Sequence, residues 1–262
     1  MSAPLLEARG VVKTFGTVNA LQGADFTVEA GTVTALVGDN GAGKSTLVKV
    51  LSGVHQPDDG DILLDGEPVS FRSPLDAHRL GIETVYQDLA LAPHLDAAAN
   101  AFLGRELRRG WVFTNKRAMR KATMAAFADL GVTTVQDVSV PVASLSGGQR
   151  QSVAIARSAM WAKRVIFLDE PTAALGVVQT RRVLDLIRRV RDQGLGVVLI
   201  THTLPDVLEV ADRVEVMRFG RRSATFDRDT ATVELLVSAI TGVYSNIAVP
   251  ETDGRSVDEV GT

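Results

Sequence analysis

One glycine-rich segment of the chain has the residue types and the spacing of a phosphate-binding loop. It fits the pattern GxxxxGK[ST] and is followed directly by Thr46; its residues are Gly38, Asp39, Asn40, Gly41, Ala42, Gly43, Lys44 and Ser45. The glycines let successive backbone N–H groups point inward, at the positively polarised start of the helix that follows. We expect this loop to bind a nucleotide triphosphate, with Lys44 on the β- and γ-phosphates and the Ser45 hydroxyl on Mg²⁺.

A pair of carboxylates follows the apolar run 165–168, where a buried strand should end. Asp169 comes 125 residues after Lys44 (169 minus 44), and Glu170 is the next residue. A phosphate-binding loop of this kind needs such a carboxylate to orient its metal ion. We therefore expect Asp169 to hold Mg²⁺ through water and Glu170 to polarise the water that attacks the terminal phosphate.

A second segment suited to anions is Leu145-Ser146-Gly147-Gly148-Gln149, which precedes the helical run 150–161. Ser146 is a good N-cap residue, and the two glycines let the backbone approach a ligand closely. LSGGQ is also the signature of ATP-binding cassette (ABC) ATPases. With the two motifs above, it makes the chain resemble this family over about residues 5–242.

The resemblance implies that two cassettes, most simply two copies of this chain, close head to tail around ATP and Mg²⁺. Each nucleotide would lie between the phosphate-binding loop of one copy and the signature of the other, with contacts from Ser146, Gly147, Gly148 and Gln149. It also implies hydrolysis of ATP. The residues that the family uses for that step match Lys44, Glu170 and His202 of this chain.

Three smaller matches support the resemblance. Gln87 follows the strand-like run 82–86 at the family's Q-loop position, which senses Mg²⁺ and faces the transporter. His202 follows the run 197–200 and matches the switch histidine, which holds the γ-phosphate and the attacking water. Phe15 lies 29 residues before Lys44 (44 minus 15), where the family places an aromatic residue against adenine; a core phenylalanine is the alternative reading.

Other stretches resemble the ribose, xylose and fructose branch of ABC importers. The family usually has SALD after the catalytic carboxylates, whereas this chain has Ala173-Ala174-Leu175-Gly176, as do ATPases of monosaccharide importers. The missing carboxylate at Gly176 removes a contact between subunits. Segments 69–77, 86–93 and 100–106 are similar to the same branch.

This branch implies an ATP-hydrolysing subunit at the cytoplasmic face of the cell membrane, bound peripherally to a separate sugar permease. A solute-binding protein would act with it indirectly. Two alternatives remain: an importer of another small polar solute such as a nucleoside, or an ABC ATPase without a transport role. Chromosome-type members carry a coiled coil before the signature, but only 102 residues separate Lys44 from Ser146 (146 minus 44), with no sustained heptads.

Apolar periodicity gives the fold class. Strand-like runs at 33–37, 165–168 and 197–200 alternate with helical spacing at 183–190 and 233–240, which predicts a parallel α/β core. We expect a P-loop NTPase (RecA-like) core with an antiparallel β subdomain, made from the first 30 residues and 61–71, and an inserted α-helical subdomain at about 89–161. Residues 1–245 should form one ATPase domain, and 246–262 a polar, flexible tail.

Composition excludes several other classes. A net charge of −3 gives no basic face for nucleic acid, and without cysteine there is no disulfide or thiolate metal site. No apolar run approaches the ~20 residues of a membrane-spanning helix, and the first residues do not resemble a secretory signal, so we expect a soluble intracellular chain. The basic stretch 105–121 is either a solvated helical surface or a contact with anionic lipid or a protein partner.

Overall fold

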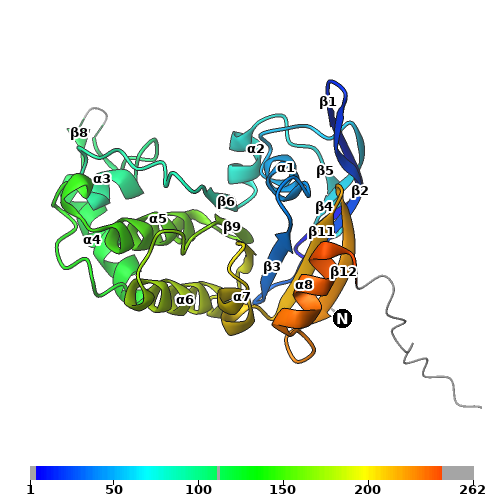
Figure 1. Cartoon of the computed structure of the whole chain (residues 1–262). Helices are drawn as coiled ribbons and strands as arrows, with labels where there is room; N and C mark the ends of the chain where they lie inside the picture. Colours follow the sequence, from blue (N-terminus) through cyan, green and yellow to red (C-terminus); the bar gives the residue numbers. More distant parts are fainter. Residues whose placement is uncertain (1–3, 111–112, 244–262) are drawn as a thin grey trace, which may run out of the picture.

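The strand-like apolar runs lie side by side in one six-stranded sheet of the computed structural model, which describes residues 4–110 and 113–243 (Figure 1). The strand order is β12-β11-β3-β10-β9-β6, and every neighbouring pair is parallel except β11 and β12. The strands are β3 (Val33–Gly38), β6 (Ile82–Val85), β9 (Val165–Asp169), β10 (Gly196–Ile200), β11 (Arg213–Arg218) and β12 (Arg221–Asp227). The parallel core expected from the sequence is confirmed.

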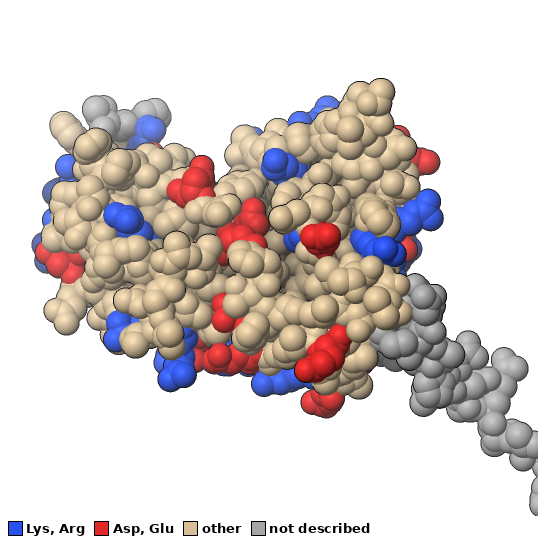
Figure 2. All heavy atoms as spheres, in the orientation of Figure 1, with Lys and Arg blue, Asp and Glu red and all other residues tan. Residues whose placement is uncertain are grey.

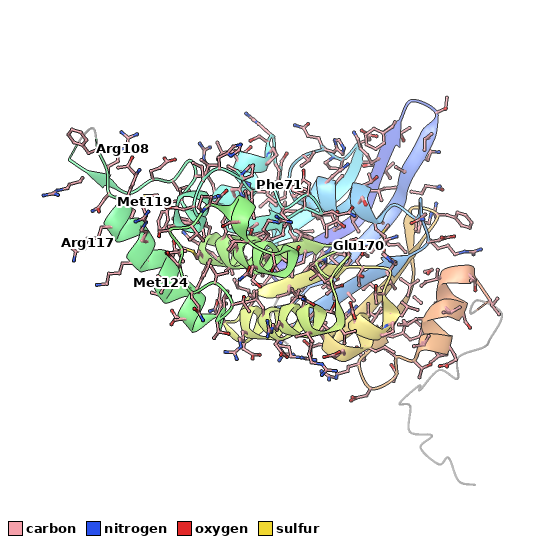
Figure 3. The ribbon with its side chains drawn as sticks, turned by 60° about the vertical axis from the view of Figure 1, so that its left-hand side comes forward. Phe71, Arg108, Arg117, Met119, Met124 and Glu170 are labelled. Atoms are coloured by element: carbon pink, nitrogen blue, oxygen red, sulfur yellow. The ribbon has the colours of Figure 1, made fainter. Side chains whose placement is uncertain are left out.

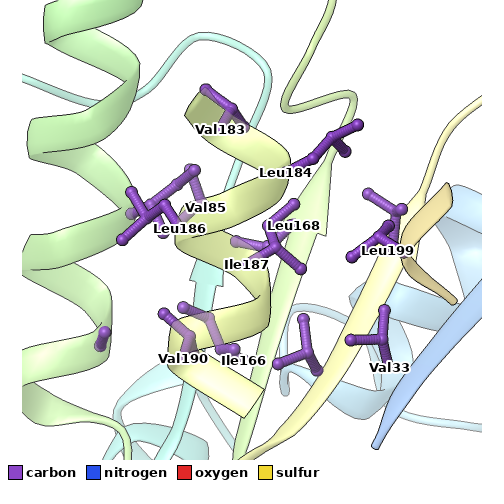
Figure 4. Close-up of a cluster of buried hydrophobic side chains, with 14 of the residues drawn as sticks. Val33, Val85, Ile166, Leu168, Val183, Leu184, Leu186, Ile187, Val190 and Leu199 are labelled. Carbon is purple, nitrogen blue, oxygen red and sulfur yellow. The ribbon is translucent and has the colours of Figure 1, made fainter. Parts of the chain in front are cut away.

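The central strands are apolar at consecutive positions because both faces of the sheet are covered. In β9, Ile166 and Leu168 pack into the cluster that contains α6 (Val177–Asp192), whereas Val165 and Phe167 pack on the opposite face with α1 (Lys44–Leu51). Figure 4 shows the first of these clusters, with side chains of α6 set against those of the strands. This packing fixes the carboxyl ends of the parallel strands, where loops that carry polar groups begin.

A second, antiparallel sheet covers one side of the core in the order β2-β1-β4-β5. It consists of β1 (Leu6–Phe15), β2 (Val18–Val28), β4 (Asp59–Leu64) and β5 (Glu67–Val69). Phe26 and Val28 of β2 are buried and alternate with less buried neighbours, as expected for a strand with one covered face. The predicted antiparallel β subdomain is confirmed.

Residues 89–161 form the lobe that lies away from this second sheet in Figure 1. The lobe contains α3 (Ala97–Ala101), α4 (Lys116–Asp129), a 3₁₀ turn (Val142–Ser144) and α5 (Gly147–Trp161). Contrary to our expectation of helices alone, a short hairpin joins α3 to α4, with strands β7 (Arg108–Arg109) and β8 (Phe113–Thr114). Two-residue strands leave no period-2 pattern in a sequence, so nothing in the residues indicated them.

Three further helices complete the fold: α2 (Pro74–Arg79), α7 (Leu204–Val210) and α8 (Val233–Thr241). The C-cap of α8 is Gly242 in the left-handed conformation, which glycine adopts without steric cost. The tail expected at 246–262 lies outside the described residues, so the domain boundary at 245 stays a prediction. Among the described residues, no helix is long and apolar enough to cross a membrane.

A buried glutamate links the two sheets. Glu215 of β11 is fully buried; Arg213 Nε lies 3.2 Å from its Oε1 and Arg222 Nη1 lies 3.7 Å from the same atom. The backbone of Thr27 in β2 donates a hydrogen bond to this carboxylate, whose Oε2 has no partner among the described residues. Burial raises the pKa of Glu215 from 4.5 to about 7, although the two arginines act in the opposite direction.

Candidate functional site

The phosphate-binding loop joins β3 to α1 as the sequence predicted. Steric contacts explain why two of its positions are occupied by glycine. Gly38, Gly41 and Gly43 all adopt positive φ angles (150°, 80° and 101°). A Cβ atom on Gly43 would lie 2.7 Å from the carbonyl oxygen of Ala20, and one on Gly38 would overlap the carbonyl oxygen of Met217. Only glycine fits both positions, because neither backbone neighbour can move aside.

The turn between β11 and β12 supports the loop from behind. The Gly220 N–H donates to the Ala42 carbonyl (2.9 Å), and the Gln22 N–H donates to the Gly220 carbonyl (2.9 Å). Three segments distant in sequence are therefore connected at the loop. These hydrogen bonds hold the backbone of the phosphate-binding loop in place.

Lys44 begins α1, and its side chain folds back over the loop. Its Nζ donates to the carbonyl oxygens of Gly38 (2.8 Å) and Asp39 (2.9 Å). Burial lowers the pKa of the Lys44 ammonium, and the charges of Glu170, Asp39 and Asp169 partly offset this effect. The ammonium group thus contacts the loop and is also affected by the charges of the two carboxylates at the end of β9.

Asp169 and Glu170 occupy the carboxyl end of β9, next to the end of β10. Asp169 pairs with Ile200 in the parallel register, and the Glu170 N–H donates to the Ile200 carbonyl (2.8 Å). Burial raises the pKa of Asp169, the Glu170 carboxylate raises it further, and Lys44 lowers it. Glu170 has a φ of 50°, an uncommon value for a residue with a side chain, and such values concentrate at functional sites.

Both oxygens of Glu170 are bonded from the loop after β10. His202 Nδ1 lies 2.8 Å from Oε1, and the Thr201 hydroxyl donates to Oε2 (3.2 Å). The imidazole is 76% exposed, so it can meet a ligand from solvent, whereas the carboxylate is 18% exposed. The sequence reading missed Thr201; its signal was a hydroxyl residue at the end of a strand adjacent to β9.

Figure 2 shows Asp and Glu side chains near the middle of the molecule, in the region where Figure 1 places the ends of β6 and β9. In Figure 3, Glu170 lies beside the sheets, whereas Arg108 and Arg117 lie at the far end of the helical lobe. Two other cations of the basic stretch form ion pairs: Arg105 with Glu83 of β6 (2.9 Å) and Arg120 with Asp96 (3.0 Å). Arg108 and Arg117 are therefore remote from the carboxylate site, whereas Arg105 reaches back to the core sheet.

Two of the expected site residues stand apart from this cluster. Gln87 is exposed two residues after β6, and within the described residues no hydrogen bond joins it to Lys44, Asp169 or Glu170. Phe15 is 42% exposed at the end of β1, so it is not a core residue. Its ring packs edge-on against His55 at a centroid distance of 5.1 Å.

The signature segment begins α5 in the helical lobe with a complete capping box. Gln149 N–H donates to the Ser146 hydroxyl (3.3 Å), and the Ser146 N–H donates to Gln149 Oε1 (2.8 Å). Gln149 Nε2 also donates to the Thr134 carbonyl (2.7 Å). The side chain of Gln149 therefore holds the helix start, and the serine N-cap expected from the sequence is confirmed.

A hollow of about 290 Å³, here called the signature hollow, opens beside this helix start. It is lined by Thr134, Ser146, Gly148, Gln149, Ser152, Gln179 and Arg182. None of these residues belongs to the phosphate-binding loop, so the two segments that the sequence predicts to bind anions do not share this space in one chain. The sequence reading did not single out Gln179 or Arg182.

The loop provides backbone N–H groups, and beside it lie the Lys44 ammonium, the Asp169 carboxylate and the Glu170 carboxylate that is bonded to His202. Ser45 follows Lys44 at the helix start and is exposed. Among the described residues, no group of three His, Asp or Glu side chains could hold a metal ion by itself. This donor set fits Mg²⁺, which binds one or two protein oxygens together with phosphates.

Comparison with known proteins identifies the family. A family model described as ABC transporter matches residues 21–173, more than half of the chain. The chain is 49% identical to a fructose import ATP-binding protein (FrcA) of Rhizobium meliloti, covering 91% of this chain and 94% of that protein. It is 46% identical to a xylose/arabinose import ATP-binding protein (XylG) of Sulfolobus acidocaldarius, covering 90% and 94%. A ribose import ATP-binding protein (RbsA 1) of Rubrobacter xylanophilus is 45% identical over 89% of this chain, which spans 46% of that protein.

Solved structures agree with the architecture. A nucleotide-free ATP-binding cassette from an ABC transporter superposes with a TM-score of 0.78 at 23% identity, covering 94% of this chain and all of that one. CbiO1 from Clostridium perfringens, part of an ABC transporter complex, gives a TM-score of 0.75 at 26% identity, covering 95% and 96%. The expected P-loop NTPase fold is confirmed. The chain therefore belongs to the ABC transporter family, as one of its ATP-binding cassettes.

Proposed function

We propose that the chain is the ATP-binding and ATP-hydrolysing subunit of an ABC importer for a monosaccharide. The observation that carries this proposal is the cluster formed by Lys44, Asp169, Glu170 and His202 at the phosphate-binding loop. Relatives that are 45–49% identical over about nine-tenths of the chain are named as import ATP-binding proteins for fructose, xylose/arabinose and ribose. These names support a sugar as the solute.

In this proposal the loop from Gly38 to Thr46 holds the phosphates through its N–H groups. The Lys44 ammonium exchanges its two carbonyl partners for phosphate oxygens, which accept stronger, charge-assisted hydrogen bonds. The exposed ring of Phe15 is available to stack on the base. The other loop residues that face the nucleotide are Asp39, Asn40, Gly41, Ala42, Gly43 and Ser45.

We assign the Mg²⁺ site to the Ser45 hydroxyl and the Asp169 carboxylate, with Gln87 approaching when the nucleotide is bound. Bound Mg²⁺ would neutralise charge on the terminal phosphates. Glu170 serves as the general base for the attacking water, because both of its oxygens are fixed by Thr201 and His202. His202, which is largely exposed, can turn towards the terminal phosphate while remaining next to the base.

Two copies of the chain complete the site. The signature hollow is separate from the phosphate-binding loop of its own chain, and the first turn of α5 beside it has N–H groups without a partner inside the helix, apart from that of Gln149, which the Ser146 hydroxyl caps. Ser146, Gly147 and Gly148 are therefore available to the nucleotide of a second copy, with Gln149 holding the helix start. This pair would lie on the cytoplasmic face of a membrane, against a separate sugar permease that receives solute from a binding protein.

The test is reconstitution of the chain with its permease in proteoliposomes. ATP hydrolysis is measured while the solute-binding protein is supplied with ribose, xylose, arabinose, fructose or a nucleoside. We expect Mg²⁺-dependent hydrolysis that one of the sugars stimulates, and none with Glu170→Gln as the matched control. Stimulation by the nucleoside alone would show an importer of another solute, and hydrolysis that no permease or solute changes would contradict a transport role.

A further inference from the structure

The signature hollow is lined in part by Gln179, a residue outside all of the motifs described above. Gln179 lies in the first turn of α6, three residues after Gly176, and is exposed. It lines the hollow together with Ser146 and Gly148 of the signature helix. A residue from a different helix therefore forms part of the same wall.

Gln179 is held in this wall by close packing against two glycines. A Cβ atom on Gly148 would lie 2.8 Å from Cγ and 3.1 Å from Cβ of Gln179, so the side chain fills the space above the signature glycine. A Cβ atom on Gly176 would lie 2.7 Å from Oε1 of Gln179. The aliphatic part of the Gln179 side chain thus lies against the signature helix, and its amide oxygen lies against the residue that precedes α6.

The other groups of the hollow are suited to an anion. Thr134, Ser146 and Ser152 provide hydroxyl groups, and Arg182 provides a positive charge. None of the residues that line the hollow is acidic. An amide that carries two N–H donors adds to this set, because phosphate oxygens accept hydrogen bonds from neutral donors and from cations alike.

We propose that the side-chain amide of Gln179 is a further phosphate-contacting group of the signature site, acting on the nucleotide held by a second copy. This inference rests on the function proposed above, in which that nucleotide meets the signature hollow. The start of α6 then belongs, together with the start of α5, to the surface that contacts the phosphates of the second copy's nucleotide. Gly176 then has a role of its own, because any side chain there would displace the amide.

The test compares variants of the full chain by their steady-state ATP hydrolysis and their ATP affinity. Gln179→Met keeps the packing over Gly148 and removes the amide, and we expect kcat to fall at least about tenfold, as for loss of a hydrogen bond to a charged group. ATP affinity of the isolated subunit should not change, because the phosphate-binding loop is intact. Gln179→Glu should lower kcat further, since its carboxylate repels phosphate. Arg181→Ala, on the same helix but outside the hollow, should keep the wild-type kcat.

Gly176→Ala supplies a second, independent perturbation, because it pushes the amide aside while leaving Gln179 in place. Its loss of kcat should match that of Gln179→Met, and the double variant should lose no more than either alone. The inference would be overturned if Gln179→Met kept the full kcat, or if the losses of the two single variants multiplied in the double variant. In both cases, hydrolysis by the wild-type chain would still support the proposed function. A wild-type chain that does not hydrolyse ATP would overturn both. Equal thermal unfolding temperatures verify that all variants are folded.

Discussion

Replacing Glu215 by glutamine should change how the stability of the protein depends on pH. Folding raises the pKa of this buried carboxyl from 4.5 to about 7. Between these two values the folded chain holds a proton that the unfolded chain releases. The free energy of unfolding therefore falls as the pH rises through this interval, and the charged carboxylate persists above it at a cost in stability.

The structure gives the size of the effect. At about 1.4 kcal/mol for each unit of pKa, the shift corresponds to about 3 kcal/mol at pH 8 relative to acid. Part of this cost has already accrued at pH 5.5, so the wild-type chain should lose about 2 kcal/mol more between pH 5.5 and pH 8 than Glu215→Gln does. Glutamine keeps the shape of the side chain and removes its titration.

Urea unfolding followed by circular dichroism at pH 5.5 and pH 8 measures this difference, with the free energy extrapolated to water. Glu67→Gln, on the exposed strand β5, is the matched control and should follow the wild type at both pH values. Equal pH dependence in the wild type and Glu215→Gln would refute the reasoning. It would mean that Arg213 and Arg222 compensate fully for the burial of the carboxylate.

Three variants of the nucleotide site give further predictions. Glu170→Gln should keep ATP binding and lower turnover at least about 100-fold, so that an ATP-bound dimer accumulates on size-exclusion chromatography; unchanged hydrolysis would remove Glu170 from the role of base. Lys44→Ala should weaken ATP binding by more than about tenfold in calorimetry, because the charge-assisted hydrogen bonds that the ammonium would make to the phosphates are lost; a smaller change would show that the backbone cradle suffices. Ser146→Arg should leave ATP binding to the monomer intact and stop hydrolysis, because the added side chain fills the signature hollow; a variant with full activity would place the second site elsewhere.

The fold could be predicted from the sequence where periodicity and burial agree. The runs at 165–168 and 197–200 are apolar at every position because helices cover one face of their sheet, and β1, β2 and α1 the other. The hairpin of β7 and β8 could not be predicted, because its strands are too short for any pattern. Glu215 could not be identified either, since its burial and its hydrogen bond from the backbone of Thr27 depend on the packing of strands that are remote in the sequence.

Some residues of the candidate site could likewise be predicted from the sequence, and others could not. Lys44, Asp169 and Ser146 stand at the ends of elements that the sequence already indicates, so their positions followed from motif and context. The contact between Glu170 and His202 requires that β9 and β10 be neighbours in register, which single-strand patterns do not specify. Gln179 lies in the hollow because two glycines leave it room, and no local rule connects residues 148, 176 and 179.

The support of the phosphate-binding loop by the turn after β11 limits where the protein can be labelled. Phe219 is 69% exposed in this turn and would be an attractive position for a fluorophore or an inserted tag. The next residue, Gly220, bonds both Ala42 and Gln22, and Phe219 itself has a φ of 48°. A probe at Phe219 would therefore disturb the loop that it is meant to monitor. Dyes for spectroscopic studies of nucleotide binding should be attached elsewhere.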